Sequence, residues 1–240
     1  YMTFTYDGAR EPALSNISFS VTRGQTVGII GGTGSGKSTL VNLIPRFYDA
    51  TEGGVLVDGH DVREYPLDQL RGKAGVVPQK AVLFHGTLRE NMQWGKKNAA
   101  DDEIYEALKT AQAFDFVEEK AEGLELYIQA GGKNLSGGQR QRLTIARALV
   151  RKPEILIMDD SASALDFATD ARLRKAIKER TQDMTVFIVS QRATTIRNAD
   201  QIVVLDDGAM VGCGTHKELF ENCEIYREIC LSQLSKEEVQ

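Results

Sequence analysis

Hydrophobic residues follow two different patterns along this 240-residue chain. At the start, apolar and polar residues alternate, with apolar positions at Met2, Phe4 and Tyr6 and again at Ile17, Phe19 and Val21. Alternation of this kind predicts an antiparallel β layer. Near-continuous apolar runs lie at residues 27–30, 155–158 and 185–189. Such runs are typical of strands buried on both faces, so they predict an α/β fold with a mostly parallel sheet.

The middle of the chain has a helical period instead. A stretch of about residues 87–121 places four apolar residues on one face, namely Ile104, Ala107, Leu108 and Ala111. A second helix is predicted from about residue 137 to 151, where Pro153 stops it. We therefore expect one domain, 1–240, in which a helical subdomain of about residues 81–149 is inserted into a RecA-like core of residues 1–80 and 150–240.

Beyond the helical stretch, strand and helix patterns alternate again. A helix is predicted near residues 168–181, and apolar positions from 201 to 211 around the turn Asp206–Gly208 predict a β-hairpin. Two further helical segments close the chain.

Composition narrows the function classes. Hydrophobic residues make up 42% and charged residues 26% of the chain, which is typical of a globular protein. A net charge of -5 provides no broad basic field, so we expect no nucleic-acid partner. The three cysteines show no metal-ligand pairing, which favours a reduced environment. Because the chain begins at Tyr1 within a strand pattern, we expect it to be an excised part of a longer protein.

The stretch between the apolar run 27–30 and the next helical pattern carries the clearest chemistry. It reads Gly31, Gly32, Thr33, Gly34, Ser35, Gly36, Lys37, Ser38 and Thr39, and it matches the P-loop pattern G-x-x-x-x-G-K-[ST]. Glycines let successive backbone N–H groups turn toward an anion, and the following helix adds its N-terminus. Lys37 can reach the β- and γ-phosphates, and the Ser38 hydroxyl can ligate Mg²⁺. A flexible Gly/Ser loop is the weaker interpretation, because every fixed position is filled in the expected strand and helix context.

A nucleotide site with bound Mg²⁺ also needs a carboxylate at the end of another buried strand. Asp159 and Asp160 directly follow the apolar run 155–158. We expect Asp159 to hold the Mg²⁺ shell and Asp160 to point beyond the γ-phosphate. Two acids that merely cap a strand end are the alternative, and the P-loop makes it the weaker one.

A second anion platform is predicted at the start of the helix near residue 137. The segment Leu135, Ser136, Gly137, Gly138 and Gln139 places a serine and two glycines where helix N–H groups are exposed. A simple helix cap is an equally good interpretation of the pentapeptide alone. Since the P-loop already occupies the chain's own phosphate site, this platform needs a second phosphate, which another subunit could present.

Together these segments resemble the ATP-binding domain of ABC transporters over essentially the whole chain. The P-loop is similar to Walker A, the pentapeptide from Leu135 to the signature, the run ending at Asp159 to Walker B, and Ser163 to Asp166 to the D-loop. The resemblance implies a P-loop NTPase core that binds ATP and Mg²⁺. It also implies a head-to-tail dimer of two such domains in which the signature residues act in trans.

The resemblance implies further roles. Gln79, in a segment similar to the Q-loop, would link the metal and the attacking water to a transmembrane partner. Tyr6 lies where an aromatic residue stacks on adenine, although a buried β-strand tyrosine is the alternative. The segments 84–91 and 205–208 are most similar to exporters, in which a membrane domain precedes this domain on the same polypeptide. Such a domain would work at the cytoplasmic face of the cell membrane.

Two positions depart from the family pattern. The family has Glu where this chain has Asp160, and His where it has Gln191. Asp is one methylene shorter than Glu, so its carboxylate falls short of the proton by roughly 1 Å, and Gln carries no titratable proton. General-base catalysis contributes about 10²–10⁴-fold, so we expect slow hydrolysis but persistent ATP binding at this chain's own site. A smaller departure is Ala130, near which exporters commonly carry an acidic residue.

These departures resemble the degenerate-site subunit of heterodimeric bacterial multidrug or lipid exporters. The candidate catalytic residues are Asp160, Gln191, Gln79 and Lys37, and the candidate metal ligands are Ser38, Gln79 and Asp159. Two alternatives stay open: a homodimeric exporter with two equal slow sites, and a non-transport ABC-type ATPase or regulatory ATP-binding module. The transported substrate stays open among drugs, lipids and peptides, because in this family it contacts the membrane domain.

Overall fold

A computed structural model describes residues 1–233 of the chain. By packing, the chain divides into two compact units. The first contains Tyr1–Ala74 and the chain from Thr185 onward, and the second is Gly75–Met184. The helical subdomain expected at about residues 81–149 lies within the second unit. No helix in the described part of the chain is both long and apolar enough to cross a bilayer.

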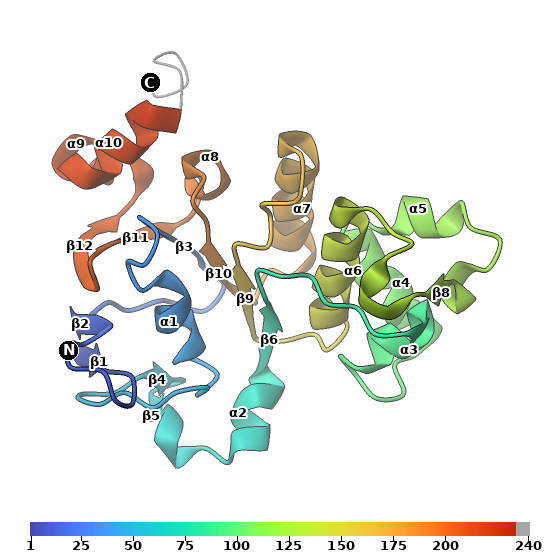
Figure 1. The fold of residues 1–240 in the computed structure, drawn as a ribbon, viewed down its shortest axis with the longest axis horizontal. Coiled ribbons are helices and arrows are strands. Elements are labelled where there is room, and N and C mark those ends of the chain that lie inside the picture. The colour runs from blue at the N-terminus through green and yellow to red at the C-terminus, as the bar shows by residue number, and fades with distance from the viewer. Residues whose placement is uncertain (234–240) are drawn as a thin grey trace. The chain divides into compact units, whose positions relative to one another are not determined.

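The first unit is built around the central strand β3 (Thr26–Gly31). It pairs in parallel with β10 (Thr185–Val189) on one side and with β11 (Gln201–Asp206) on the other. Every residue of β10 is buried, as are the last five of β3. The apolar runs at residues 27–30 and 185–189 therefore do mark buried parallel strands, and Figure 1 shows β3 between β11 and β10.

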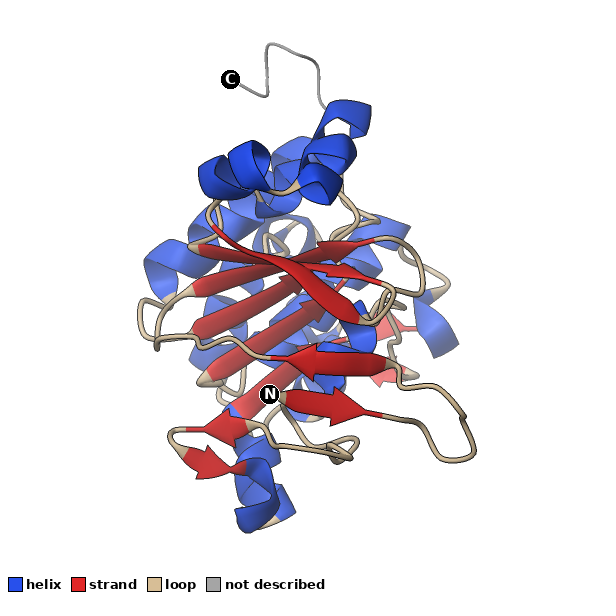
Figure 2. Cartoon of the chain, turned by 90° about the vertical axis from the view of Figure 1, so that its left-hand side faces the viewer, coloured by secondary structure: helices blue, strands red, loops and turns tan. Residues whose placement is uncertain are grey.

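An antiparallel layer extends this sheet. Strand β11 forms the expected hairpin with β12 (Ala209–Gly214), and β1 (Met2–Phe4) pairs antiparallel with β2 (Leu14–Ile17). Within the unit the strands follow the order β1-β2-β12-β11-β3-β10. Figure 2, which is turned so that this unit faces the viewer, shows its strands side by side.

The structure ends β2 earlier than the sequence pattern does. Alternation continues through Phe19 and Val21, but the backbone pairing with β1 runs only from Leu14 to Ile17. Phe19 and Val21 are only half-buried, so their alternation reflects partial burial rather than membership of the ladder. The N-terminal β layer is confirmed in its antiparallel sense and is shorter than predicted.

The helices of the first unit are short. They are α1 (Lys37–Asn42), α2 (Leu67–Lys73), α8 (Ala193–Ile196), α9 (His216–Asn222) and α10 (Glu224–Gln233). Helix α10 packs against α9 and α8 (Figure 1). A small hairpin of β4 (Leu56–Val57) and β5 (His60–Asp61), followed by the 3₁₀ turn η1 (Val62–Glu64), completes this unit.

The second unit is mostly helical. Two neighbouring strands, β6 (Ala74–Val77) and β9 (Ile155–Asp159), accompany five helices: α3 (Leu88–Gln93), α4 (Asp101–Thr110), α5 (Phe114–Glu118), α6 (Gly137–Leu149) and α7 (Phe167–Arg180). Its small elements are β7 (Gly86–Thr87), β8 (Tyr127–Ile128) and the 3₁₀ turns η2 (Gly123–Glu125) and η3 (Ala130–Gly132).

Helix α4 forms the core of this helical layer. It packs against α6 and α7, and its predicted apolar face is buried at Ile104, Ala107 and Leu108, with Ala111 buried just beyond its end. Glu103 strengthens the helix start, because its carboxylate accepts a hydrogen bond from the Ala100 N–H at 3.1 Å. The residues that the sequence pattern places on one apolar face are therefore the residues buried in the structure.

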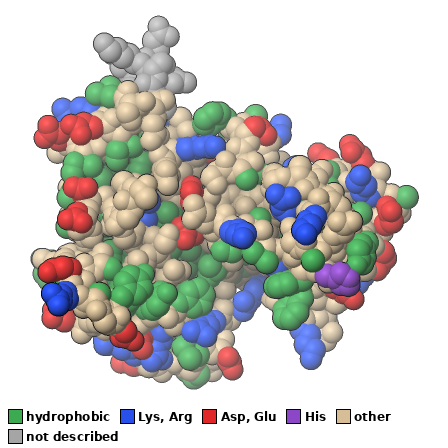
Figure 3. All heavy atoms as spheres, viewed as in Figure 1, with side chains coloured by type: hydrophobic (Ala, Val, Ile, Leu, Met, Phe, Trp, Pro, Cys, Tyr) green, Lys and Arg blue, Asp and Glu red, His purple; other side chains and the backbone are tan. Residues whose placement is uncertain are grey.

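Charged side chains of both signs are interspersed on the face shown in Figure 3. With a net charge of -5, no field of one sign dominates this face.

Candidate functional site

The P-loop connects β3 to α1 and depends on its glycines. Gly34 and Gly36 have φ values of 79° and 96°, in the left-handed region that favours glycine. A Cβ at Gly31 would lie 2.1 Å from the backbone oxygen of Leu205 on β11, so no larger residue fits there. The loop carbonyl of Ser35 accepts a hydrogen bond from the Gly208 N–H of the β11–β12 turn at 3.2 Å. Strand β11 and the turn of its hairpin therefore contact the P-loop and hold its backbone in place.

Lys37 brings a positive charge into this loop. Its side chain is buried, and Nζ donates to the carbonyl oxygens of Gly31 at 2.9 Å and Gly32 at 2.7 Å. Helix α1 has only six residues, so it offers the N–H groups of its first turn rather than a large dipole. An ammonium group beside first-turn amides and a glycine loop is an environment suited to phosphate oxygens.

Tyr6 lies just beyond β1 and remains 38% exposed. Its hydroxyl hydrogen-bonds to Oγ1 of Thr39 at 2.8 Å, which ties it to the first helix after the P-loop. Its ring meets those of Phe4 and Tyr48 edge-on, with centroid distances of 4.7 and 5.2 Å. Tyr6 is neither buried nor part of β1, so the buried β-strand alternative does not hold. Adenine stacking remains a prediction.

Gln191 lies at the same sheet edge as the P-loop. Strand β10 is parallel to β3, with Val189 opposite Ile29, and the Ser190 N–H donates to the Ile29 carbonyl at 3.1 Å. Because parallel strands end at one edge, Gln191 follows β10 where the P-loop follows β3. The Gln191 side chain is exposed. Its backbone carbonyl accepts a hydrogen bond from Gln233 of α10 at 2.7 Å.

The second unit brings Gln79 and Asp160 together. Gln79 follows β6, Asp160 follows β9, and Nε2 of Gln79 donates to Oδ2 of Asp160 at 3.3 Å. Asp160 has a φ of 46°, a left-handed conformation that Asp tolerates better than most residues. Asp159 ends β9 and is half-buried. Asp159 and Asp160 are therefore adjacent carboxylates with different backbone conformations, one at the end of strand β9 and one in the turn after it.

The signature segment caps helix α6. Ser136 Oγ accepts from the Gln139 N–H at 3.1 Å, and Gln139 Oε1 accepts from the Ser136 N–H at 3.0 Å. The helix-cap interpretation is therefore realised as a reciprocal capping box. The space beside Gly137 remains open, since an added Cβ there would find its nearest neighbour, Arg140 Nη2, at 3.8 Å. The cap is compatible with an anion platform, whose use in trans remains a prediction.

Asp166 starts helix α7. Its carboxylate accepts from the Thr169 N–H at 2.9 Å and from the Thr169 hydroxyl at 2.7 Å. These two donors lower the pKa of Asp166 below its ordinary value, so the carboxylate stays charged. The next residue, Phe167, keeps an exposed aromatic side chain. Capping of helix α7 is therefore a local structural role for Asp166, the Asp of the segment similar to the D-loop.

The predicted site residues fall into two sets. Tyr6, the P-loop and Gln191 belong to the first unit, whereas Gln79, Asp159, Asp160, the signature and Asp166 belong to the second. Sequence patterns missed the Thr39 bond to Tyr6 and the Gln233 bond to Gln191. Neither has a local signal, because the partners are 33 and 42 positions apart.

The donor chemistry of these residues suits Mg²⁺. Ser38 offers an exposed hydroxyl and Asp159 a half-buried carboxylate. The residues described include no group of three or more His, Cys, Asp or Glu side chains that could hold a metal by themselves. Mg²⁺ usually takes one or two protein carboxylates together with substrate phosphates and water, so a sparse set of oxygen donors fits it.

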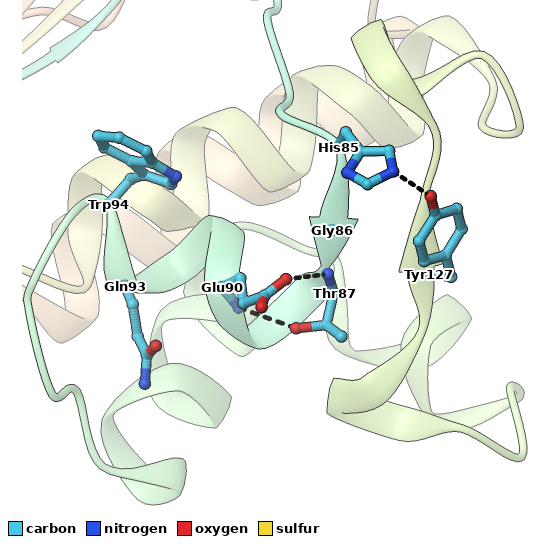
Figure 4. Close-up of a pocket in the computed structure, with 7 residues that line it drawn as sticks. All are labelled: His85, Gly86, Thr87, Glu90, Gln93, Trp94 and Tyr127. Carbon is cyan, nitrogen blue, oxygen red and sulfur yellow. Dashed lines mark hydrogen bonds between the residues drawn. The ribbon is translucent and has the colours of Figure 1, made fainter.

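A separate groove lies in the second unit (Figure 4). Its volume is about 580 Å³, and its lining residues are His85, Gly86, Thr87, Glu90, Gln93, Trp94 and Tyr127. Glu90 and Thr87 cap α3 reciprocally, and His85 hydrogen-bonds to the Tyr127 hydroxyl. Trp94 remains 71% exposed at the end of α3. Aromatic and polar groups thus meet in an open, preformed depression.

Comparison with known proteins places these features in context. Residues 14–163 match the family model described as ABC transporter. An ABC transporter ATP-binding protein of Mycobacterium tuberculosis is 47% identical over 234 residues, covering 96% of this chain and 40% of that protein. A Staphylococcus aureus protein named as a multidrug export ATP-binding/permease protein is 41% identical over 229 residues, covering 95% of this chain and 40% of its own length.

The fold agrees with these matches. The solved structure of a bacterial Atm1-family ABC exporter with ATP bound superposes with a TM-score of 0.93 at 36% identity. The match covers 98% of this chain and 41% of that one. This chain therefore spans about two fifths of the length of the relatives described above.

Proposed function

Since this chain belongs to the ABC transporter family of ATP-binding domains, we propose that it is the ATPase domain of an exporter. In this proposal it binds ATP at the cytoplasmic face of the membrane and couples binding and hydrolysis to a transmembrane domain. The relative named as a multidrug export ATP-binding/permease protein supports a membrane domain on the same polypeptide. Drug, lipid and peptide substrates all fit this proposal, because none of them would contact this chain.

The observation that carries the proposal is the position of Lys37 in the P-loop. Its ammonium group is buried at the Gly31 and Gly32 carbonyls, within a loop that favours glycine at positions 31, 34 and 36. There it would neutralise the β- and γ-phosphates of ATP. Tyr6 would stack on adenine, since its exposed ring is held beside the loop by the bond to Thr39.

Ser38, Asp159 and Gln79 would hold Mg²⁺. The ion, when bound, would neutralise charge on the β- and γ-phosphate oxygens. Ser38 follows Lys37 directly at the start of α1, whereas Asp159 ends β9 and Gln79 follows β6 in the second unit. Their oxygen atoms are the hard donors that this ion prefers.

Hydrolysis at this chain's own site should be slow. A general base must come within about 2.6–3.2 Å of the proton that it takes, and Asp160 is one methylene shorter than the Glu of the family pattern. Gln79 also donates to the Asp160 carboxylate, which directs one oxygen toward an amide rather than toward water. Gln191 can donate a hydrogen bond to the γ-phosphate but cannot exchange a proton with it.

The signature segment would serve a second ATP site. Gly137 borders open space at the start of the thirteen-residue helix α6, so N–H groups there can meet a phosphate from another subunit. We therefore propose a head-to-tail dimer in which this chain holds ATP at its own P-loop. Its signature would complete a faster site on a partner that carries Glu and His. A homodimer with two equal slow sites is the alternative.

The groove of Figure 4 is our proposed contact with the transmembrane domain. It is lined by the exporter-like segment near His85 and by Tyr127, and it presents the exposed ring of Trp94. An aromatic residue beside polar groups suits a protein segment that docks with partial burial. Glu90 is an acidic residue in the lining of this groove, and the exposed Trp94 ring offers apolar contact there.

The proposal is tested by ATP turnover of the full-length protein that carries this chain. We expect slow phosphate release when it is purified alone and a marked increase when it is co-purified with a chain that has Glu and His at the two positions. Brisk hydrolysis by the protein alone would contradict the slow site. Failure to bind ATP at all would contradict the proposed function as a whole.

A further inference from the structure

The end of helix α10 contacts the loop that carries Gln191. Nε2 of Gln233 donates to the Gln191 carbonyl at 2.7 Å, and Oε1 of Gln233 accepts from the Ala193 N–H at 2.8 Å. One side-chain amide thus bonds two backbone groups two residues apart. All three residues lie in the first unit.

These two bonds add to the backbone hydrogen bonds of the loop. On the sheet side, the Ser190 N–H donates to Ile29 at 3.1 Å, and the Arg192 N–H donates to Ser190 Oγ at 3.0 Å. Ala193 starts helix α8, and a first-turn N–H has no partner within its own helix. Gln233 supplies that partner from a distant helix, while its amide hydrogen satisfies the carbonyl of Gln191.

The packing of helix α10 determines the position of Gln233. Tyr226, Cys230 and Gln233 are spaced i, i+4 and i+7, so they share one face of α10. Tyr226 and Cys230 are fully buried on that face, and the Tyr226 hydroxyl bonds to His216 Nδ1 at 2.8 Å. The packed face of α10 therefore sets where the Gln233 amide reaches.

We propose that Gln233 is a positioning residue for the Gln191 loop. Gln233 holds the backbone that follows the Gln191 side chain, and the Ser190 bond to Ile29 holds the backbone before it, so that together they keep this side chain directed at the position of the γ-phosphate. Since ADP lacks this phosphate, Gln233 affects the affinity for ATP and leaves that for ADP unchanged. The inference rests on the proposed function, because it requires an ATP site at this P-loop.

The test compares ATP and ADP on the full-length protein. Gln233→Met is the informative variant, because Met keeps the side-chain length and the helix propensity and removes both hydrogen bonds. Ser232→Ala is the matched control, since among residues 1–233 the Ser232 hydroxyl donates to the Ile229 carbonyl within α10, at 2.8 Å, and not to the Gln191 loop. Photolabelling with an azido-ATP identifies the site on this chain, and unlabelled ATP or ADP competes for it.

We expect Gln233→Met to raise the ATP concentration needed for half-competition by about three- to tenfold, the usual range for one or two hydrogen bonds. Competition by ADP should stay within about twofold, and Ser232→Ala should change neither nucleotide. An unchanged ATP value, or equal losses for ATP and ADP, would overturn the positioning role. If neither nucleotide competes on the unmodified protein, the proposed function fails and this inference fails with it.

Discussion

The side-chain amide of Gln79 donates to the carboxylate of Asp160 at 3.3 Å. The two residues are 81 positions apart and follow the neighbouring strands β6 and β9. The bond is longer than most N–H···O bonds, so it orients the carboxylate without holding it tightly. The proposed slow site rests in part on this contact, because one Asp160 oxygen faces an amide.

We predict that Asp160→Asn has a small effect on ATP turnover. If Asp160 contributes little as a base, phosphate release by the full-length protein should fall by less than about tenfold. Removing an effective general base would lower turnover by about 10²–10⁴-fold instead. A loss of that size would make Asp160 the working base and favour the homodimer with two equal sites.

We predict that Tyr6 contributes to ATP affinity through its ring. Stacking of a base on an aromatic side chain is worth about 1–3 kcal/mol, so Tyr6→Ala should weaken ATP binding at least about fivefold. Tyr6→Phe keeps the ring and loses only the bond to Thr39, so its affinity should stay within about twofold of the original. Binding can be measured by isothermal titration calorimetry.

Two controls separate stacking from loop support. Inorganic triphosphate has no base, so Tyr6→Ala should leave its binding unchanged. Tyr48→Ala removes an exposed ring from the same aromatic cluster and should leave ATP affinity nearly unchanged. Equal losses from Tyr6→Phe and Tyr6→Ala would show that the hydroxyl, through Thr39, is what matters.

Much of the fold follows from local patterns. The buried runs of β3 and β10, the apolar face of α4 and the cap at Ser136 all match their sequence signals, because each depends on neighbours within a few residues. Two hydrogen bonds could not be predicted in this way, namely Gln79 to Asp160 and Gln233 to Gln191. Each joins segments that are far apart in the sequence, and each depends on the rotamer of one side chain. Phe19 and Val21 show a second limit of prediction from sequence. Alternation of apolar and polar residues indicates burial, but it does not show which residues form the hydrogen bonds of a strand.

We predict that His216 makes stability depend on pH. Burial, and next the charge of Arg197, lower the pKa of His216 below its ordinary value of 6.5. The unfolded chain therefore binds this proton more readily than the folded chain does, so folding stability is full above about pH 6.5 and is lost as pH falls toward the lower folded pKa. Urea midpoints at about pH 7.5 and about pH 5.5 measure this loss.

His216→Asn provides the comparison for that prediction. Asn retains a polar group near the Tyr226 hydroxyl but does not titrate in this range. Its urea midpoint should fall less between the two pH values than that of the unmodified chain. An identical fall in both proteins would assign the pH dependence to groups other than His216.

The most direct test of a slow, nucleotide-holding site restores the two residues of the family pattern. We would measure ATP turnover of the full-length protein with Asp160→Glu and Gln191→His together, using Lys37→Ala in the same background to subtract any hydrolysis that does not depend on this P-loop. We predict a rise of about tenfold or more, because a base within reach of water contributes about 10²–10⁴-fold. Unchanged or lower turnover in the double variant would contradict the claim that Asp160 and Gln191 limit hydrolysis at this site.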